Sequence, residues 1–340
     1  MILFTGSTGL IGRRLITRLV EANGPDGILC LVRDKQDSPL EKSGLMILER
    51  LGVRTIPGDL LKKESLLLLP RSPDSVIHLA SLTDTSQADH SINDVGTKNL
   101  LDAIGPLGPQ VHFVYASSIA ANDGRADPHS PMTESVDPGR PYHVYGRKKL
   151  ATERHLIQEG IRTGFALSII RVCGVFGLGS IEKGLYSSLK RLVLNRSPLT
   201  RLNWPGKISS MHVDDMAYVI EQVSRSKPPP GEHRLYIPST DAYTVQQLCE
   251  AYYRAAGLPY DAIGCPASFW KAVEWVTGHK RFWEFILPHR LYNKVWQANI
   301  LVSQGYWNKS ETLKSLLGSR RLKTFEEPCA ECAQEPSRPA

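Results

Sequence analysis

Tyr145 and Lys149 are the side chains of this sequence best suited to acid–base chemistry. Four residues apart on a helix, they would face the same way. A free tyrosine has a pKa of about 10 and is a poor acid or base at neutral pH. A neighbouring ammonium group favours the phenolate and lowers that pKa. Tyr145 could then exchange a proton with the hydroxyl or carbonyl group of a substrate.

The spacing alone is weak evidence, because Tyr186 and Lys190 repeat it. Tyr145 is preferred because it lies near the start of the helix that follows a strand ending at Ser118. The Ser118 hydroxyl could donate a hydrogen bond to the same substrate oxygen. Tyr186 and Lys190 lie beyond the sixth expected strand, where a half-exposed helix pair without a chemical role is expected.

A glycine turn opens the chain with Gly6, Gly9 and Gly12. It follows an apolar run, Ile2–Phe4, and precedes an amphipathic stretch, Arg13–Glu21, so strand, turn and helix come in the order that a phosphate-binding turn requires. The glycines would let the backbone approach a pyrophosphate, and the helix N-terminus offers unpaired N–H groups to it. The alternative is a glycine-rich turn without a ligand. With a nicotinamide dinucleotide on this turn, Tyr145 would move its proton while a hydride moves to or from the cofactor.

Arg33 is the first residue after the second expected strand, Gly27–Val32. Its guanidinium suits a 2′-phosphate, which favours NADP over NAD. Asp34 could instead reach the ribose hydroxyls and weaken that preference, and Arg33 could be an exposed loop residue. Lys149 could also hold the ribose of the cofactor. Asp59 could accept a hydrogen bond from an adenine amino group or cap the short helix expected over Lys62–Leu69.

The rest of the first half alternates strands and helices. Mostly apolar strands separated by amphipathic helices are typical of a parallel sheet covered on both faces, so the expected fold class is α/β with a doubly wound sheet. A loop is expected over Asp123–Arg140. The further strands are expected over 53–56, 75–79, 111–116 and 166–172, and the helices over 41–51, 93–104 and 142–158.

Composition narrows the functional class. The 340 residues carry a net charge of +7, which favours anionic ligands, but no long Lys/Arg run indicates nucleic acid. The six cysteines are mostly far apart, which argues for a reducing compartment, and Cys329 and Cys332 supply too few ligands for a zinc site, so no metal is expected. The sequence begins directly on a strand and has no apolar run near the about 20 residues of a spanning helix. A cytoplasmic protein without a signal peptide or transmembrane segment is expected.

The ordered motifs resemble the extended short-chain dehydrogenases/reductases of the epimerase/dehydratase-like superfamily. The resemblance covers roughly residues 1–240. It rests on Thr5 to Gly12, Gly58-Asp59-Leu60, His78-Leu79-Ala80, Asn93, Ser117-Ser118, Tyr145 with Lys149, Arg171 to Gly177 and His212-Val213-Asp214-Asp215.

The resemblance implies a Rossmann domain over residues 1–175, to which 208–238 return, and a smaller, mostly helical substrate domain over 176–207 and 239–320. Residues 321–340 are expected to be a disordered tail. A homodimer is also implied. The implied catalytic set is Ser118, Tyr145, Lys149 and Asn93, and the cofactor would contact Gly6, Thr8, Gly9, Leu10, Ile11, Gly12, Arg33, Asp59, Leu60, Leu79, Ala80, Tyr145 and Lys149.

Asn93 would support the lysine through water in this family, although a helix N-cap is an equally open role. Asp214 and Asp215 are expected to be structural residues that join the two domains. Sugar-nucleotide members often carry an arginine a few residues before the His-Val-Asp-Asp stretch. This chain has residues 208–211 (Ile-Ser-Ser-Met) there, with Lys207 the nearest cation, and residues 305–308 (Gly-Tyr-Trp-Asn) lack the proline of the frequent C-terminal signature.

The C-terminal third predicts a strand over Arg234–Pro238, a helix over Thr244–Ala256 with Thr244 as N-cap, and then helices crowded with aromatic residues. These aromatic residues could pack the small domain, line a hydrophobic substrate site or contact a membrane surface. They are Phe269, Trp270, Trp275, Phe282, Trp283, Phe285, Tyr292 and Trp296.

The function that fits best is an NADP-dependent oxidoreductase that reduces a ketone or oxidises a secondary alcohol on a small, possibly hydrophobic substrate. One alternative is a sugar-nucleotide epimerase or dehydratase with tightly bound NAD. Another is a redox-inactive binding protein on the same fold.

Overall fold

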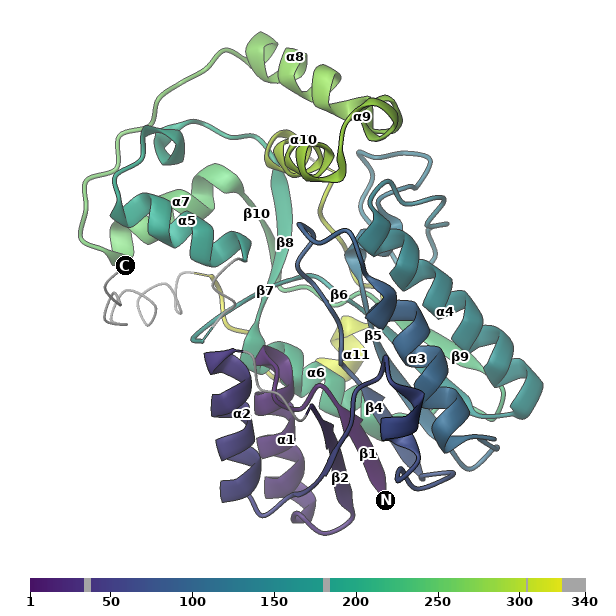
Figure 1. Cartoon of the computed structure of the whole chain (residues 1–340). Coiled ribbons are helices and arrows are strands. Elements are labelled where there is room, and N and C mark those ends of the chain that lie inside the picture. The colour runs from purple at the N-terminus through teal and green to yellow at the C-terminus, as the bar shows by residue number, and fades with distance from the viewer. Residues whose placement is uncertain (34–37, 180–183, 304, 326–340) are drawn as a thin grey trace.

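A seven-stranded, fully parallel sheet forms the centre of the molecule, with strand order β3-β2-β1-β4-β5-β6-β9 (Figure 1). The computed structural model describes residues 1–33, 38–179, 184–303 and 305–325. The strands of this sheet are β1 Ile2–Thr5, β2 Ile28–Val32, β3 Arg54–Pro57, β4 Ser75–His78, β5 His112–Ser118, β6 Ala166–Val172 and β9 His233–Tyr236.

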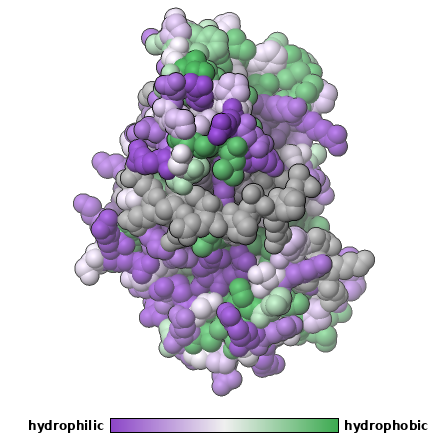
Figure 2. Space-filling view, turned by 90° about the vertical axis from the view of Figure 1, so that its left-hand side faces the viewer, coloured by the Kyte–Doolittle hydropathy of each residue, from purple (hydrophilic) through white to green (hydrophobic). Residues whose placement is uncertain are grey.

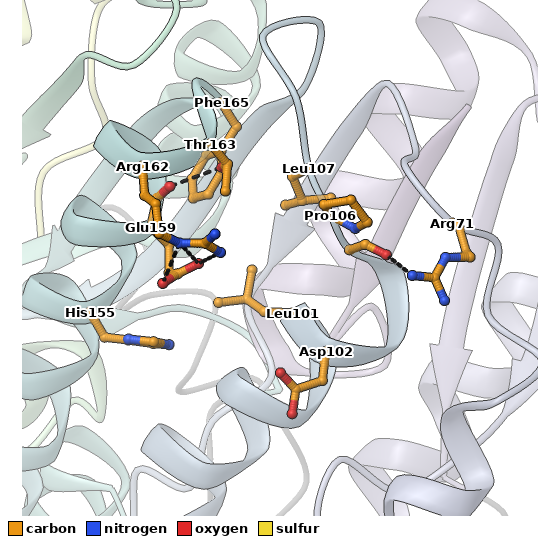
Figure 3. A pocket seen from close by; sticks show the side chains of 11 residues that line it. Arg71, Leu101, Asp102, Pro106, Leu107, His155, Glu159, Arg162, Thr163 and Phe165 are labelled. Carbon is orange, nitrogen blue, oxygen red and sulfur yellow. Dashed lines mark hydrogen bonds and ion pairs between the residues drawn. The ribbon is translucent and has the colours of Figure 1, made fainter.

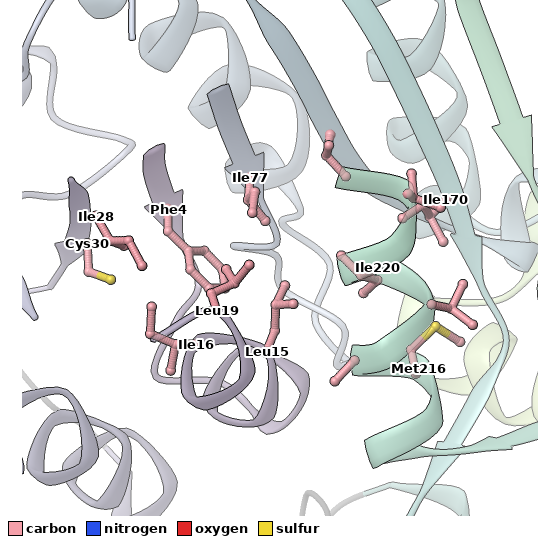
Figure 4. Packing of buried hydrophobic residues seen from close by; sticks show 14 of the residues in the cluster. Phe4, Leu15, Ile16, Leu19, Ile28, Cys30, Ile77, Ile170, Met216 and Ile220 are labelled. Carbon is pink, nitrogen blue, oxygen red and sulfur yellow. The ribbon is translucent and has the colours of Figure 1, made fainter. Parts of the chain in front are cut away.

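Helices cover both faces of this sheet. On one face α1 packs against α6, and on the other α3 packs against α4. The first face buries Phe4, Leu15, Leu19, Ile77 and Ile220 together (Figure 4), and each such side chain contributes about 1.5–3 kcal/mol by leaving water. The predicted doubly wound α/β fold is confirmed. The helices are α1 Leu10–Asn23, α2 Pro39–Arg50, α3 Ser91–Ile104, α4 Val144–Thr163 and α6 Val213–Arg225.

Two local expectations need correction. The short helix expected over residues 62–69 is only a single 3₁₀ turn, η1 Lys63–Leu66. Ser65 explains the tight turn, because its hydroxyl donates to the carbonyls of Asp59 and Lys62. The helix expected from Tyr142 begins at Val144, because His143 is extended and caps it by accepting a hydrogen bond from the Tyr145 N–H.

A second, three-stranded sheet in the order β10-β8-β7 lies above the first one in Figure 1, with helices α5 and α7–α10 around it. We call these helices and this sheet the cap. The expected helix α7 is present, and Thr244 is its N-cap within a complete capping box. The small sheet was not predicted. The cap consists of β7 Gly174–Phe176, α5 Leu185–Leu194, β8 Lys207–His212, β10 Asp241–Thr244, α7 Val245–Ala255, α8 Ala267–Gly278, α9 Lys280–Ile286 and α10 His289–Val302.

The aromatic residues of the cap divide into two groups. Trp270, Tyr292 and Trp296 are buried and pack the cap, as the first alternative expected. The others include Trp275 and Phe285, which are 70% and 89% exposed. Hydrophobic residues accordingly gather on the surface at the top of the molecule, where the α8–α10 region lies (Figure 2). In the described part of the chain, every helix is too short or too polar to span a membrane.

The segment after the cap returns to the large sheet. Asp215 accepts hydrogen bonds from the Arg320 side chain and the Lys323 N–H, and Asp214 forms ion pairs with Lys323 and Arg14. These two aspartates therefore hold residues 320–323, which follow α11 Leu313–Leu317, against α6 and α1. The disordered tail was expected to begin at residue 321, but residues 321–325 are held in place and Phe325 is buried in the core of the cap. Residues 326–340, with Cys329 and Cys332, lie outside the described residues.

Candidate active site

The glycine turn lies directly against the end of β4. Gly6 has a φ of +79°, and a Cβ there would lie 2.5 Å from the Ala80 backbone nitrogen. A Cβ on Gly12 would lie 2.1 Å from the Gly6 carbonyl oxygen. Only glycine fits both positions, so the backbone itself forms the surface at the start of α1. A dinucleotide pyrophosphate needs such a surface, and the residues present fit that group.

Tyr145 and Lys149 face the end of β5 from the first turns of α4. The Lys149 Nζ donates to the Ala116 carbonyl at 2.8 Å, and the hydroxyls of Ser118 and Ser81 lie close enough to the Tyr145 phenol to act on its pKa. Tyr145 and Lys149 are almost completely buried. Both side chains thus point to the end of β5, and Ser118 lies beside the phenol.

The protonation of this pair differs from the expectation. Burial raises the pKa of Tyr145, while its hydrogen bonds to Ser118 and Ser81 act in the opposite direction. Burial also lowers the pKa of Lys149 to about 7, against the attraction of the Glu153 carboxylate. The expected lowering of the Tyr145 pKa by Lys149 is therefore wrong for the protein alone: desolvation outweighs the effect of a lysine that is itself only partly charged at neutral pH.

Asn93 organises the loop between β4 and α3. Its Oδ1 accepts hydrogen bonds from the Ser81 hydroxyl at 2.9 Å and from the Leu82 N–H at 3.0 Å. Its backbone carbonyl accepts a hydrogen bond from Thr152 of α4. The N-cap of α3 is His90, so the expectation that Asn93 caps this helix is wrong. Asn93 instead fixes Ser81, which in turn contacts the phenol.

A buried ion pair between β6 and α4 lies next to Lys149 and Ser118. Arg171 of β6 pairs with Glu153 of α4 at 2.6 Å, and Ser117 donates a hydrogen bond to the same carboxylate. Arg171 also donates to the side-chain oxygen of Asn122. Glu153 was not identified from the sequence. Its position one helical turn after Lys149, at the i, i+4 spacing, is the signal that could have identified it.

A second buried ion pair ties the cap to the loop that follows β5. Asp123 pairs with Lys280 of α9 at 2.9 Å. Its carboxylate also accepts hydrogen bonds from Trp296 and from the hydroxyl of Tyr306. No motif in the sequence indicated Asp123.

Two histidines border the phenol and were also missed. The His90 ring lies 5.4 Å from the Tyr145 ring, and His143 lies 6.2 Å from His90 and 4.6 Å from Trp296 between ring centroids. Burial lowers the pKa of His143 to about 3, with the neighbouring His289 acting in the same direction. This imidazole is therefore a neutral cap and packing group at the start of α4.

After the end of β2, Arg33 forms an ion pair with Glu41 of α2 and is about half exposed. Asp59 accepts a hydrogen bond from the Leu61 N–H, but the N-cap of η1 is Lys62 without a side-chain capping bond, so the expected capping role of Asp59 is wrong. Leu60 is buried beneath α3. Asp34 lies outside the described residues. Thr8, Gly9, Leu10 and Ile11 occupy the turn and the start of α1.

The second Tyr–Lys pair lies in the cap. Tyr186 is buried in the core of the cap on α5, and its hydroxyl is hydrogen bonded to Ser210 at 2.7 Å. Tyr186 therefore packs the cap, and it is more buried than the half-exposed position that was expected.

One pocket of 390 Å³ lies at the far ends of α3 and α4, well away from Tyr145 (Figure 3). Its walls carry Arg71, Asp102, His155, Glu159 and Arg162, and Arg162 pairs with Glu159 at 2.6 Å. This polar surface pocket contains none of the predicted site residues. Within the described ranges, no three His, Cys, Asp or Glu side chains are arranged to hold a metal ion.

Comparison with known proteins agrees with this geometry. The model of the NAD dependent epimerase/dehydratase family matches residues 2–234. The sheet order, the glycine turn and the Tyr–Lys pair define an extended short-chain dehydrogenase/reductase, a class of nicotinamide-dependent enzymes. The chain belongs to the NAD dependent epimerase/dehydratase family.

Two relatives show how wide this family is. The chain is 34% identical over 142 residues to the GDP-6-deoxy-D-mannose reductase of Pseudomonas aeruginosa, a match that covers 40% of this chain and 46% of that protein. It is 24% identical over 271 residues to a polyketide synthase-nonribosomal peptide synthetase of Pyricularia grisea, covering 77% of this chain and 7% of that protein. The matched segments thus span less than half of the length of either relative.

Solved structures share the whole fold. The UDP-glucose 4-epimerase of Bifidobacterium longum, solved in complex with NAD+ and UDP, superimposes with a TM-score of 0.70 at 16% identity, covering 97% of this chain and 96% of that one.

Proposed function

We propose that this protein is an NADP-dependent oxidoreductase that reduces a ketone, or oxidises the corresponding secondary alcohol, with Tyr145 as the general acid and base. One arrangement carries the proposal: the Tyr145 phenol, the Ser118 hydroxyl and the buried Lys149 amine meet at the end of β5. Ser81, which contacts the phenol, directly follows Ala80, which packs against Gly6 of the turn.

In this proposal Ser118 donates a hydrogen bond to the substrate oxygen and positions it against the phenol. Tyr145 gives its proton to that oxygen in the direction of reduction and removes it in the direction of oxidation. Lys149 exchanges protons near neutral pH and lies one turn further along the same face of α4. A bound nicotinamide would supply or accept the hydride, and the glycine turn and Lys149 would hold its dinucleotide. Asn93 keeps Ser81 in place. We further propose that the protein is cytoplasmic and homodimeric.

The substrate proposal rests on the strand that precedes the His-Val-Asp-Asp stretch. Ser209, Ser210 and Met211 of β8 are buried, and Lys207 lies over the Trp307 ring at 4.4 Å. None of these residues presents a free cation to a substrate diphosphate, so a substrate that lacks a diphosphate fits better. The alternative, an epimerase or dehydratase of a nucleotide sugar, is supported by the family model and by the fold shared with a UDP-glucose epimerase.

The test is turnover by the purified chain. NADPH absorbance is followed with a panel of ketones, and NADP+ reduction with secondary alcohols. Tyr145→Phe should lower kcat at least about 100-fold, the usual contribution of general acid–base catalysis, while the Kd for the cofactor stays within about twofold. Tyr186→Phe is the matched control, because it lies at the same spacing from a lysine, and it should keep kcat within about threefold.

Other outcomes identify the alternatives. NAD that co-purifies with the chain, together with conversion of a nucleotide sugar, would establish the epimerase or dehydratase. A chain that binds no nicotinamide dinucleotide and turns over none of the panel would overturn the proposal in favour of a redox-inactive binding protein.

A further inference from the structure

Three arginines lie along α1, and they differ in how their charges are balanced. Arg18 pairs with Glu221 at 2.6 Å, and Arg14 lies 3.5 Å from Asp214. Arg13, on the first turn, has no carboxylate partner among the residues that the structure describes.

Arg13 is nevertheless the most buried of the three, at 8% exposure. Its Nη1 donates to the Ser43 hydroxyl at 3.3 Å and its Nη2 to the Gly179 carbonyl at 3.5 Å, both long contacts. Its Nε is buried and has no hydrogen-bond partner. Burial, with the neighbouring charge of Arg14, lowers the pKa of the guanidinium. A buried charge without a counter-ion is costly, so this group is poised for an anion.

The site of this charge is next to the glycine turn. Arg13 directly follows Gly12, and Ser43 precedes Gly44 of α2. A Cβ on Gly44 would lie 2.5 Å from the Cα of Thr8, so α2 packs directly on the turn. The Ser43 hydroxyl and the Arg13 guanidinium therefore meet between α1 and α2, one residue along α2 from the point where it packs on the turn. A pocket of 270 Å³ adjoins Arg13, with Arg14, Thr17, Arg18, Ile47 and Asp214 as its other lining residues.

Arg33, the residue that the sequence suggested for a cofactor phosphate, is placed differently. Its guanidinium pairs with Glu41, two residues before Ser43, and is about half exposed. An ion partner already balances that charge, whereas the Arg13 charge has none. Of the two arginines, Arg13 gains more from an incoming anion.

We propose that Arg13, with the Ser43 hydroxyl, binds the 2′-phosphate of NADP and makes the enzyme prefer NADP to NAD. This inference rests on the proposed function, since it names the group that recognises its cofactor. A phosphate monoester offers three acceptor oxygens, and a guanidinium can donate to two of them side by side through Nε and an Nη. The pyrophosphate, which NAD and NADP share, has the glycine turn and the start of α1 as its own surface.

The experiment compares the Kd values of NADPH and NADH for the wild type, Arg13→Gln and Arg50→Gln, measured by nucleotide fluorescence. The wild type should bind NADPH more tightly. Arg13→Gln should weaken NADPH at least about 10-fold, which is the loss of one charge-assisted hydrogen bond, and leave NADH within about twofold. Arg50→Gln, which removes an exposed cation at the end of α2 outside the pocket, should change either Kd by less than about threefold. Arg13→Lys, which keeps the charge, should recover part of the NADPH affinity.

A second readout separates ligand binding from a structural role. Without cofactor, Arg13→Gln should unfold at the same temperature as the wild type or higher, because it removes an uncompensated buried charge. A lower Tm together with unchanged selectivity would mean that Arg13 is only a packing residue, and would overturn the inference.

Equal weakening of NADPH and NADH in Arg13→Gln would place the contact on the shared pyrophosphate and also overturn the inference. A wild type that binds NADH more tightly than NADPH would also overturn the inference, but it would leave the proposed oxidoreductase function in place. A wild type that binds neither dinucleotide would overturn the proposed function as well.

Discussion

Two buried ion pairs involve the adjacent residues Asn122 and Asp123, the first through a hydrogen bond and the second directly, yet they join different parts of the molecule. Asn122 accepts a hydrogen bond from Arg171, whose guanidinium pairs with Glu153. Asp123, the next residue, pairs with Lys280. All four charged side chains are at most 8% exposed. The first pair connects α4 to β6 within the large sheet unit, whereas the second connects the loop after β5 to the cap.

This difference separates two tasks. The Glu153 carboxylate lies one turn from Lys149 and opposes the lowering of its pKa by burial, so the first pair acts on the Lys149 amine and supports α4. The second pair has no contact with Tyr145 or Lys149, but it gathers Trp296 and Tyr306 around one carboxylate. We infer that the first pair sets the chemistry and the second sets the position of the cap over it.

The largest effect is expected when one partner of the first pair is removed. Arg171→Met leaves the Glu153 carboxylate buried without its cation, and the free energy of unfolding should fall by about 3–5 kcal/mol. Urea denaturation measures this change. The matched control is Arg162→Met, which breaks an exposed ion pair with Glu159 and should cost less than about 1 kcal/mol. A similar loss in both variants would refute the special role of the buried pair.

A smaller and more local effect is expected in the second pair. Asp123→Asn keeps an acceptor for Trp296 and Tyr306 but removes the charge that Lys280 faces, and should cost about 2 kcal/mol. Hydrogen exchange should rise in α8–α10 and stay unchanged in α4, and KM should rise more than kcat falls. Asp127→Asn, in the same loop but exposed, is the control. Faster exchange in α4 would show that the two pairs act as one unit.

The smallest effect is a dependence of stability on pH at Lys149. Its pKa is about 7 in the folded protein and about 10.4 when unfolded. Between these values the unfolded state binds the extra proton, so the free energy of unfolding rises with pH. The wild type should gain about 1–2 kcal/mol between pH 7 and pH 8.5 relative to Lys149→Met. Parallel curves for the two proteins in urea titrations at these pH values would contradict the assigned pKa.

The sequence predicted the features that depend on neighbouring residues. The strand, glycine turn and helix at the start are encoded within 23 residues, and the Tyr145–Lys149 pair within one helical turn. The missed features depend on residues far apart in the chain. Asp123 and Lys280 are 157 positions apart, and Asp123 and Tyr306 are 183 positions apart.

Burial explains the other misses. Arg13 carries the same charge as Arg14 and Arg18, and only the approach of Ser43 and Gly179 distinguishes it. The small sheet joins strands of three to six residues from three separate parts of the chain, each too short for a clear periodic pattern. The raised pKa of Tyr145 likewise follows from desolvation, which spacing does not reveal.

The adjacency of Asn122 and Asp123 has a practical consequence for domain exchange between relatives. A chimera that keeps this sheet unit and receives a foreign cap would leave Asp123 without Lys280, Trp296 and Tyr306. Such a chimera should fold only when those three residues are retained as well, or when Asp123 is replaced by a neutral residue at the same time.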